Sequence, residues 1–287
     1  MYEGGVWKDK LGEPPQQAIH RFMDEGLLEA SGLEDRMFYQ FNTAALKSLA
    51  KKNGLKISGS KDALIQRLIE NDKMSMRTAT KQTILYKCSE SGLKIVREYL
   101  ENENANRVRA EDKIQNLLET GEFAKAVNVM AEFEASQISP RGLGVDWKNY
   151  DVGSDVDSLK IIFSATPMLL AGMEKGRLLQ IRLAAGMMQL WGTNKANRWL
   201  PKEFQTGFHL DGDVASRMLV FYASHCRNMK AYKSSGIEFA EILGTPDSCA
   251  ECQQINGKRF RLVDVPELPY AKCLCENGCR CIATATR

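Results

Sequence analysis

The sequence has no apolar run long enough to cross a bilayer. The longest such run, residues 161–172, is interrupted by Pro167 and falls short of the roughly 20 apolar residues that a spanning helix needs. Residues 1–8 also lack the apolar core of a secretory signal. We therefore expect a cytoplasmic protein with no membrane partner.

The net charge is small, and the sequence lacks the common catalytic motifs. The formal net charge of +3 excludes a generally polybasic protein, so any nucleic-acid contact must come from a local patch. The three histidines, His20, His209 and His225, are scattered, and none is spaced to form a nucleophile–base pair. No phosphate loop, dinucleotide fingerprint or nuclease motif occurs. We expect a protein that is not an enzyme and has no small-molecule substrate.

The composition that is present is typical of a soluble globular protein. Of the 287 residues, 44% are apolar and 26% are charged, which is enough for two or three small domains with real cores. Helical periodicity dominates, and strand patterns are confined to residues 237–243 and 259–263. We expect a mainly α, multi-domain protein with a small β-containing tail. The expected segments are an N-terminal helical segment (1–40), a two-helix module (41–73), a helical linker and hairpin (74–140), a helical domain (141–245) and a cysteine-rich module (246–287).

Turn signals divide these segments further. Residues 74–81 are expected to be a linker, and the polar run 101–104 a surface connection after a helix at 92–100. A helical hairpin is expected at 107–137, with its turn at Thr120 and Gly121. Further helices are expected at 158–171, at 176–191 and, with Asp213 as the N-cap, at 213–232.

Residues 42–71 contain two short helical patterns separated by a glycine loop. Gly54 suits the left-handed residue that ends a helix, and Ser60 can cap the start of the next one. The apolar residues of the two helices can pack against one another: Leu46, Leu49, Ala50, Leu64, Ile65, Leu68 and Ile69. This segment resembles the SAP family, whose pattern is a leucine–lysine helix, Gly-Leu, a short Ser-Gly loop and a Lys-x-x-Leu helix. The resemblance covers residues 41–73 and implies weak binding to duplex DNA, with little sequence preference, through the loop and the start of the second helix.

A physical argument favours the same surface. Backbone N–H groups at a helix N-terminus attract phosphate, and basic residues between 42 and 73 outnumber acidic ones by four. The candidate DNA contacts are Lys47, Lys51, Lys52, Lys56, Ser58, Gly59, Ser60, Lys61 and Arg67. About three or four phosphate contacts give only weak binding at physiological salt. The alternative is a protein-docking hairpin with a solvated lysine face.

Six of the eight cysteines lie close together near the end of the sequence. Their spacing is Cys249-x2-Cys252 followed by Cys273-x-Cys275-x3-Cys279-x-Cys281. In a reducing compartment such clusters are metal ligands more often than disulfides, and two cysteine pairs can complete a tetrahedral zinc site. We expect a structural zinc ion in a zinc-ribbon-like tail, bound first by Cys249 and Cys252, then by Cys279 and Cys281, with Cys273 and Cys275 as substitutes or redox partners. A pair of disulfides and an iron–sulfur site are the alternatives.

The tail carries a second resemblance. Cys249-Ala-Glu-Cys252, Gly257-Lys258-Arg259-Phe260, Pro269 and Cys279-Arg280-Cys281 resemble the C-terminal region of phage Mu F-like head-morphogenesis (minor capsid) proteins. This chain lacks the His-Pro that usually precedes Cys-Arg-Cys in that family, and it has Cys273 and Cys275 in addition. The resemblance implies a phage or prophage origin. We therefore expect a phage-type accessory protein that contacts DNA, and alternatively a capsid-assembly protein whose tail docks a phage structural protein.

Overall fold

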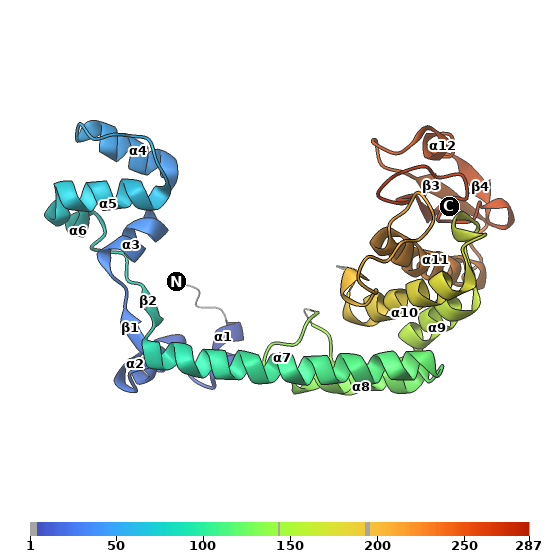
Figure 1. Ribbon diagram of the computed structural model, residues 1–287, viewed down its shortest axis with the longest axis horizontal. Helices are drawn as coiled ribbons and strands as arrows, with labels where there is room; N and C mark the ends of the chain where they lie inside the picture. The colour runs from blue at the N-terminus through green and yellow to red at the C-terminus, as the bar shows by residue number, and fades with distance from the viewer. Residues whose placement is uncertain (1–4, 143, 193–195, 287) are drawn as a thin grey trace. The chain divides into compact units, whose positions relative to one another are not determined.

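The computed structural model describes residues 5–142, 144–192 and 196–286. Residues 1–4, 143, 193–195 and 287 of the expected segments lie outside this range. The protein is mainly helical with two small antiparallel sheets, one of them beside the cysteine-rich end, so the predicted fold class is confirmed (Figure 1). The chain divides into two compact units, residues 1–104 and 105–287, and this division falls inside the expected segment 74–140.

The first unit contains a helical module that begins and ends on a pair of strands. Its elements are α1 (Gly5–Leu11), α2 (Pro15–Asp24), β1 (Leu28–Ala30), α3 (Leu33–Gln40), α4 (Thr43–Lys52), α5 (Lys61–Asn71), α6 (Lys73–Ala79), β2 (Tyr86–Cys88) and the start of α7 (Glu90–Glu119). The two strands are antiparallel, with Leu28 opposite Cys88 and Ala30 opposite Tyr86. Helices α3 to α6 lie between them in the chain and share one small core: Met37, Leu46, Ala50, Leu64, Ile65, Leu68 and Met76.

Three sequence predictions for this part of the chain were wrong. Strand structure is not confined to the tail, because β1 and β2 also pair. The expected linker 74–81 is mostly helix α6, which Asp72 caps by accepting a hydrogen bond from the Ser75 N–H at 2.9 Å and which buries Met76. The expected connection at 101–104 is the middle of α7. Glutamate and asparagine are compatible with an exposed helix face, and neither glycine nor proline interrupts residues 93–119.

The second unit consists of helices packed on a three-stranded sheet. Its elements are the rest of α7, α8 (Phe123–Ser136), α9 (Gly153–Ser164), α10 (Lys175–Trp191), α11 (Gly212–Ser234), β3 (Phe239–Leu243), α12 (Ala250–Gln253), β4 (Arg259–Arg261) and β5 (Ile282–Thr286). Single turns of 3₁₀ helix lie at Trp147–Asn149, Met168–Leu170, Ala196–Arg198 and Leu262–Asp264. The predicted hairpin at 107–137 is confirmed by α7 and α8, with Gly121 in the turn at φ +74°.

Helices α9 and α11 differ in their bounds from the predicted helices. Helix α9 ends at Ser164 rather than at residue 171, because Pro167 follows and a residue before proline disfavours the helical conformation. Asp211, not Asp213, caps α11, where its carboxylate accepts a hydrogen bond from the Val214 N–H at 2.7 Å. Asp213 instead accepts one from the Ala196 N–H at 2.7 Å and pairs with Arg217.

The main core of the second unit includes the cysteine-rich segment. Strand β3 lies between β4 and β5, so Ala240 faces Phe260 on one side and Ala285 on the other. The strands predicted at 237–243 and 259–263 are confirmed as β3 and β4, whereas β5 was not predicted. Buried residues of α10 and α11 form one continuous core with the sheet and with the cysteines Cys252, Cys273, Cys279 and Cys281.

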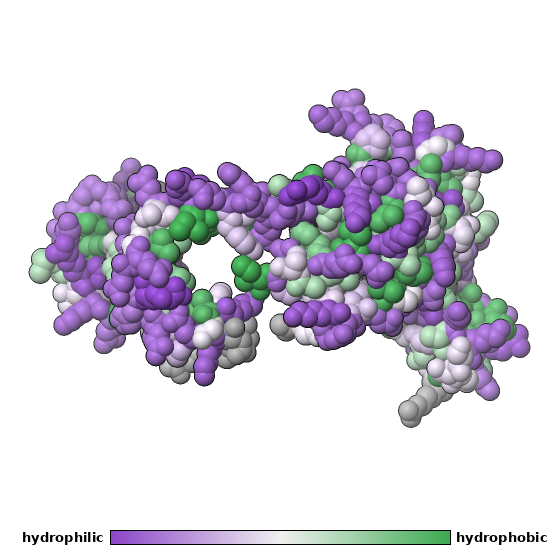
Figure 2. Space-filling model, turned by 90° about the horizontal axis from the view of Figure 1, so that it is seen from below, coloured by the Kyte–Doolittle hydropathy of each residue, from purple (hydrophilic) through white to green (hydrophobic). Residues whose placement is uncertain are grey.

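One face of the protein is largely polar. Figure 2 shows a face on which hydrophilic residues predominate and apolar residues form small patches. Within the described residues, no helix has the length and apolar character required to span a membrane.

Candidate functional site

The two helices of the SAP-like hairpin are capped by their own side chains. Asn42 accepts a hydrogen bond from the Ala45 N–H at 2.9 Å, and Ser60 accepts one from the Ala63 N–H at 3.3 Å. Gly54 adopts φ +68°, as expected for the residue that ends α4. The loop of residues 53–60, called the SAP loop below, therefore leads directly into the capped N-terminus of α5.

Arg67 holds the SAP loop in place. Its guanidinium donates hydrogen bonds to the carbonyl oxygens of Lys56 and, at 2.6 Å, of Ser58. Gly59 adopts φ +118°, and a Cβ at this position would lie 2.8 Å from Arg67 Nη2. The glycine therefore permits both the backbone conformation and the close approach of the arginine. Arg67 lies two turns after Ser60 on the same face of α5, which is the sequence signal that could have revealed this role.

Lys61 also binds the protein itself. Its ammonium donates a hydrogen bond to the Phe38 carbonyl oxygen at 2.6 Å and lies 4.0 Å from the centre of the Phe38 ring. Phe38 belongs to α3, a helix that lies outside residues 41–73 and for which the sequence predicted no contact with this module. Two of the nine candidate DNA contacts, Lys61 and Arg67, are thus half-buried and bonded to backbone carbonyls.

The other seven candidate contacts are exposed, and they lie on α4, on the SAP loop or at the start of α5: Lys47, Lys51, Lys52, Lys56, Ser58, Gly59 and Ser60. Ile57, in the same loop, is also 47% exposed. Against the other face of α5 is a pocket lined by the acidic residues Glu34, Asp35 and Asp62. The exposed lysines gather on α4 and the SAP loop, and a polyanion is attracted to that side of the module.

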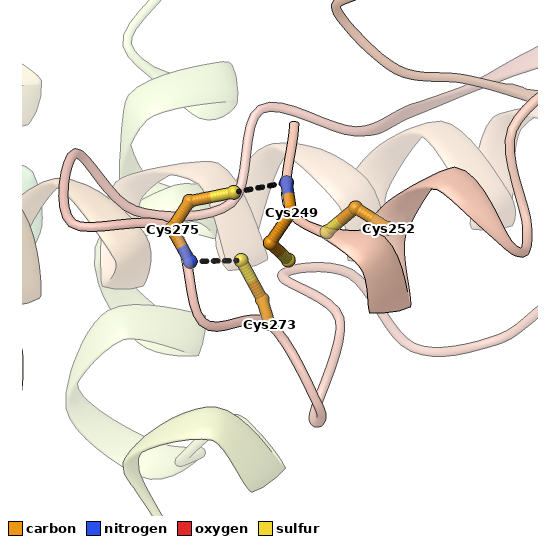
Figure 3. Close-up of side chains that lie close together, drawn as sticks. All are labelled: Cys249, Cys252, Cys273 and Cys275. Atoms are coloured by element: carbon orange, nitrogen blue, oxygen red, sulfur yellow. Dashed lines mark hydrogen bonds between the residues drawn. The ribbon is translucent and has the colours of Figure 1, made fainter. Parts of the chain in front are cut away.

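The six clustered cysteines come together in the second unit. Cys249 occupies the N-cap position of α12, Cys252 lies within this helix, and the other four lie between Tyr270 and β5. The sulfur atoms of Cys249, Cys252, Cys273 and Cys275 lie within 4.8 Å of one another (Figure 3), and those of Cys252, Cys279 and Cys281 do so as well. The four-thiol group therefore joins the Cys249–Cys252 pair to Cys273 and Cys275, not to Cys279 and Cys281 as the sequence analysis preferred.

Backbone N–H groups support several of these sulfur atoms. The Leu274 N–H donates to the Cys249 sulfur at 3.3 Å, and the Cys249 N–H donates to the Cys275 sulfur at 3.2 Å. The Cys275 N–H donates to the Cys273 sulfur at 3.4 Å, and the Tyr270 N–H donates to the Cys279 sulfur at 3.2 Å. A neutral thiol is a weak acceptor, whereas a metal-bound thiolate is negative and accepts such bonds well. The arrangement therefore suits ionised, metal-binding cysteines.

The thiol pKa values separate into two groups. Hydrogen bonds from Cys273 and Cys281 lower the pKa of Cys279 to about 2. Burial opposes ionisation of Cys249, but backbone N–H donors outweigh it and lower the pKa of this thiol to about 6. Burial raises the pKa of Cys252 to about 12. The pKa values of Cys273 and Cys281 are raised as well, so ionising Cys252, Cys273 and Cys281 requires a cation among them, since like charges at this separation repel one another.

Comparison with known protein families decides the nature of the hairpin. The family model of the SAP domain matches residues 40–73. Residues 40–73 are a SAP domain. This confirms the resemblance seen in the sequence, and a SAP domain indicates binding to DNA or RNA. Neither a curated protein nor a solved structure matched the chain, and the resemblance of the tail to phage Mu F-like proteins received no support from these comparisons.

Proposed function

We propose that this protein is a cytoplasmic, non-catalytic accessory protein of phage or prophage type that binds duplex DNA through its SAP domain. The proposal rests on the SAP match together with the exposed lysines of α4 and the SAP loop beside the N-terminus of α5. The excess of basic over acidic residues between 42 and 73 makes this surface attractive for phosphate.

The SAP domain divides the work between two kinds of basic residue. Arg67 holds the SAP loop through two of its backbone carbonyls, and Lys61 ties the start of α5 to the Phe38 carbonyl of α3, so both shape the surface from within. The exposed lysines Lys47, Lys51, Lys52 and Lys56 contact phosphates, and the free N–H groups at the start of α5 add to the attraction. None of these groups reads base edges, so binding is weak and has little sequence preference.

We further propose that the cysteine centre binds zinc in a structural role. An all-sulfur ligand set of at least four converging thiols suits zinc, and it leaves no open position for a catalytic water. The centre stabilises the sheet β4–β3–β5, because its cysteines belong to the same core as that sheet. Iron–sulfur coordination is the alternative, and the visible absorption of the purified protein distinguishes the two.

Binding to a labelled duplex, followed by fluorescence anisotropy at two salt concentrations, tests the DNA proposal. We expect binding that weakens steeply with salt, since each phosphate contact contributes about −0.9 to the slope of log K against log salt. The pair Lys52→Gln and Lys56→Gln should reduce both the affinity and the slope. The matched control pair, Lys94→Gln and Lys113→Gln, removes the same charge from exposed positions of α7 and should change neither.

Two results would contradict the proposal. An absence of binding at low salt would make the module a protein-docking hairpin. Competition by single-stranded RNA that exceeds competition by duplex DNA would make RNA the ligand instead.

The second candidate function is that of a phage head-morphogenesis protein whose cysteine-rich tail docks a structural partner. It is supported by the resemblance of the tail and by α11 and β3, which precede Cys249 in the order that this resemblance implies. Genes for terminase and portal beside the gene of this protein would favour this role. A neighbourhood of regulators would favour the accessory role.

A further inference from the structure

Two of the six clustered thiols occupy a central position. Cys252 belongs both to the four-thiol group and to the group that contains Cys279 and Cys281. Cys273, a member of the four-thiol group, also hydrogen-bonds through its side chain to Cys279 and to Cys252. The remaining four cysteines divide into Cys249 and Cys275 on one side of this central pair and Cys279 and Cys281 on the other.

The number of ligands fits two tetrahedral ions. Two such ions need eight ligand positions between them, and six thiolates fill these only when two of the six are shared. Cys252 belongs to both groups, and the side chain of Cys273 interacts with Cys279 as well as with Cys252, so these two sulfurs are the ones placed to be shared. Two divalent ions with six thiolates carry a net charge of about −2, the same as one ion with four thiolates. A single ion would leave two thiols next to an anionic centre in a buried site.

We propose that the six cysteines bind two zinc ions, with Cys252 and Cys273 as bridging thiolates. This inference rests on the proposed metal centre and specifies its composition. Cys249 and Cys275 complete the coordination of one ion, and Cys279 and Cys281 that of the other.

The surroundings of the sulfurs support a centre with two halves. Backbone N–H groups donate to Cys249 and Cys275 in the first half, to the central Cys273, and to Cys279 in the second half. The second half is therefore prepared for a thiolate in the same way as the first. Cys252 and Cys273 are buried, as are Cys279 and Cys281, so solvent does not reach the proposed bridging sulfurs.

Native mass spectrometry of the full-length protein, purified with zinc, tests the stoichiometry. We expect two zinc ions per chain. The double variant Cys279→Ser and Cys281→Ser should retain one ion, because the four-thiol group stays intact, and Cys249→Ser with Cys275→Ser should also retain one. Cys88→Ser, which removes a thiol of β2 in the other unit, should retain two.

The possible failures are distinguishable. One ion per chain in the unmodified protein would overturn the two-metal centre and leave the proposed structural zinc site standing. An absence of bound zinc in folded protein would overturn both. Cadmium NMR of the unmodified protein does not depend on whether the variants fold. Two resonances that split one another through shared sulfurs are expected, and two unsplit resonances would overturn the bridging thiolates.

Discussion

Arg67 offers a decisive test of how the SAP domain is built. It is a candidate phosphate ligand by charge, yet its guanidinium donates two hydrogen bonds to carbonyl oxygens of the SAP loop. Hydrogen bonds that involve a charged group contribute roughly 1.5–3 kcal/mol each when buried. Since Arg67 is only half-buried, we expect Arg67→Ala to destabilise the domain by about 2 kcal/mol in total.

Amide hydrogen exchange in α5 measures this loss directly. Leu64 and Leu68 belong to the core of the domain, so their amides exchange when it opens. A loss of about 2 kcal/mol raises their exchange rates about 30-fold. Arg67→Lys should restore little of the stability, because an ammonium group does not match the forked geometry that joins the two carbonyls.

DNA binding provides the contrast with a direct phosphate ligand. For Arg67→Ala we expect weaker binding with an almost unchanged salt slope at temperatures where the domain stays folded, since the number of phosphate contacts is preserved. Lys56→Ala should leave the amide exchange rates of α5 unchanged and make the salt slope of binding smaller by about one unit. If Arg67→Ala left the exchange of Leu64 and Leu68 unchanged and reduced the slope by one unit, the assignment of Arg67 to the SAP loop would be refuted.

Three other predictions concern different parts of the chain. Gly92→Ala should destabilise the first unit by about 1–3 kcal/mol in denaturant unfolding, because the new Cβ would lie 2.1 Å from the Leu27 carbonyl oxygen. The control Gly32→Ala should be tolerated, because no atom lies nearer than 3.9 Å to the new Cβ. Burial lowers the pKa of His225 below 6.5, so as the pH falls the unfolded chain takes up this proton before the folded protein does. Thermal unfolding of the second unit should therefore show that its stability decreases as the pH is lowered through about 6.5, and this decrease should be less steep in His225→Gln. Removal of metal by a strong chelator should accelerate amide exchange in β3 and β5 and leave α5 unchanged, since the cysteines share a core with the sheet and α5 belongs to a separate one.

The elements predicted best from the sequence are those whose patterns lie within a few consecutive residues. The SAP hairpin has helical periodicity, a glycine at its turn and a serine cap within a few residues, and all of these occur in the structure. Apolar and charged residues are interspersed in the segments that form β3 and β4, as in half-buried strands. Strand β5 instead has small residues such as Ala283 and Ala285, and it becomes a strand by pairing with β3. Strands β1 and β2 are three residues long and are far apart in the sequence, so nothing local predicts their pairing.

The cysteines were correctly selected as one cluster, but their grouping depended on tertiary structure. Cysteine spacing defines local pairs and gives no information on which pairs meet. Helix α12 and the turn before Cys273 bring Cys249 and Cys252 to Cys273 and Cys275. The internal bonds of Lys61 and Arg67 were missed for a similar reason, because formal charge counts a bonded and a solvated cation alike.

The strand pair β1–β2 places the two ends of the SAP-bearing stretch side by side. The Ser31 N–H donates to the Leu85 carbonyl oxygen at 2.9 Å, directly next to the Ala30–Tyr86 pair. Residues 31–85 therefore form an insertion whose ends meet as the two arms of a hairpin do, with a core of their own. Such a cassette can be exchanged for a short reverse turn while the register of β1 and β2 is kept, or grafted into a hairpin of another protein. The SAP domain of this chain therefore lies in a segment that can be transferred as one unit.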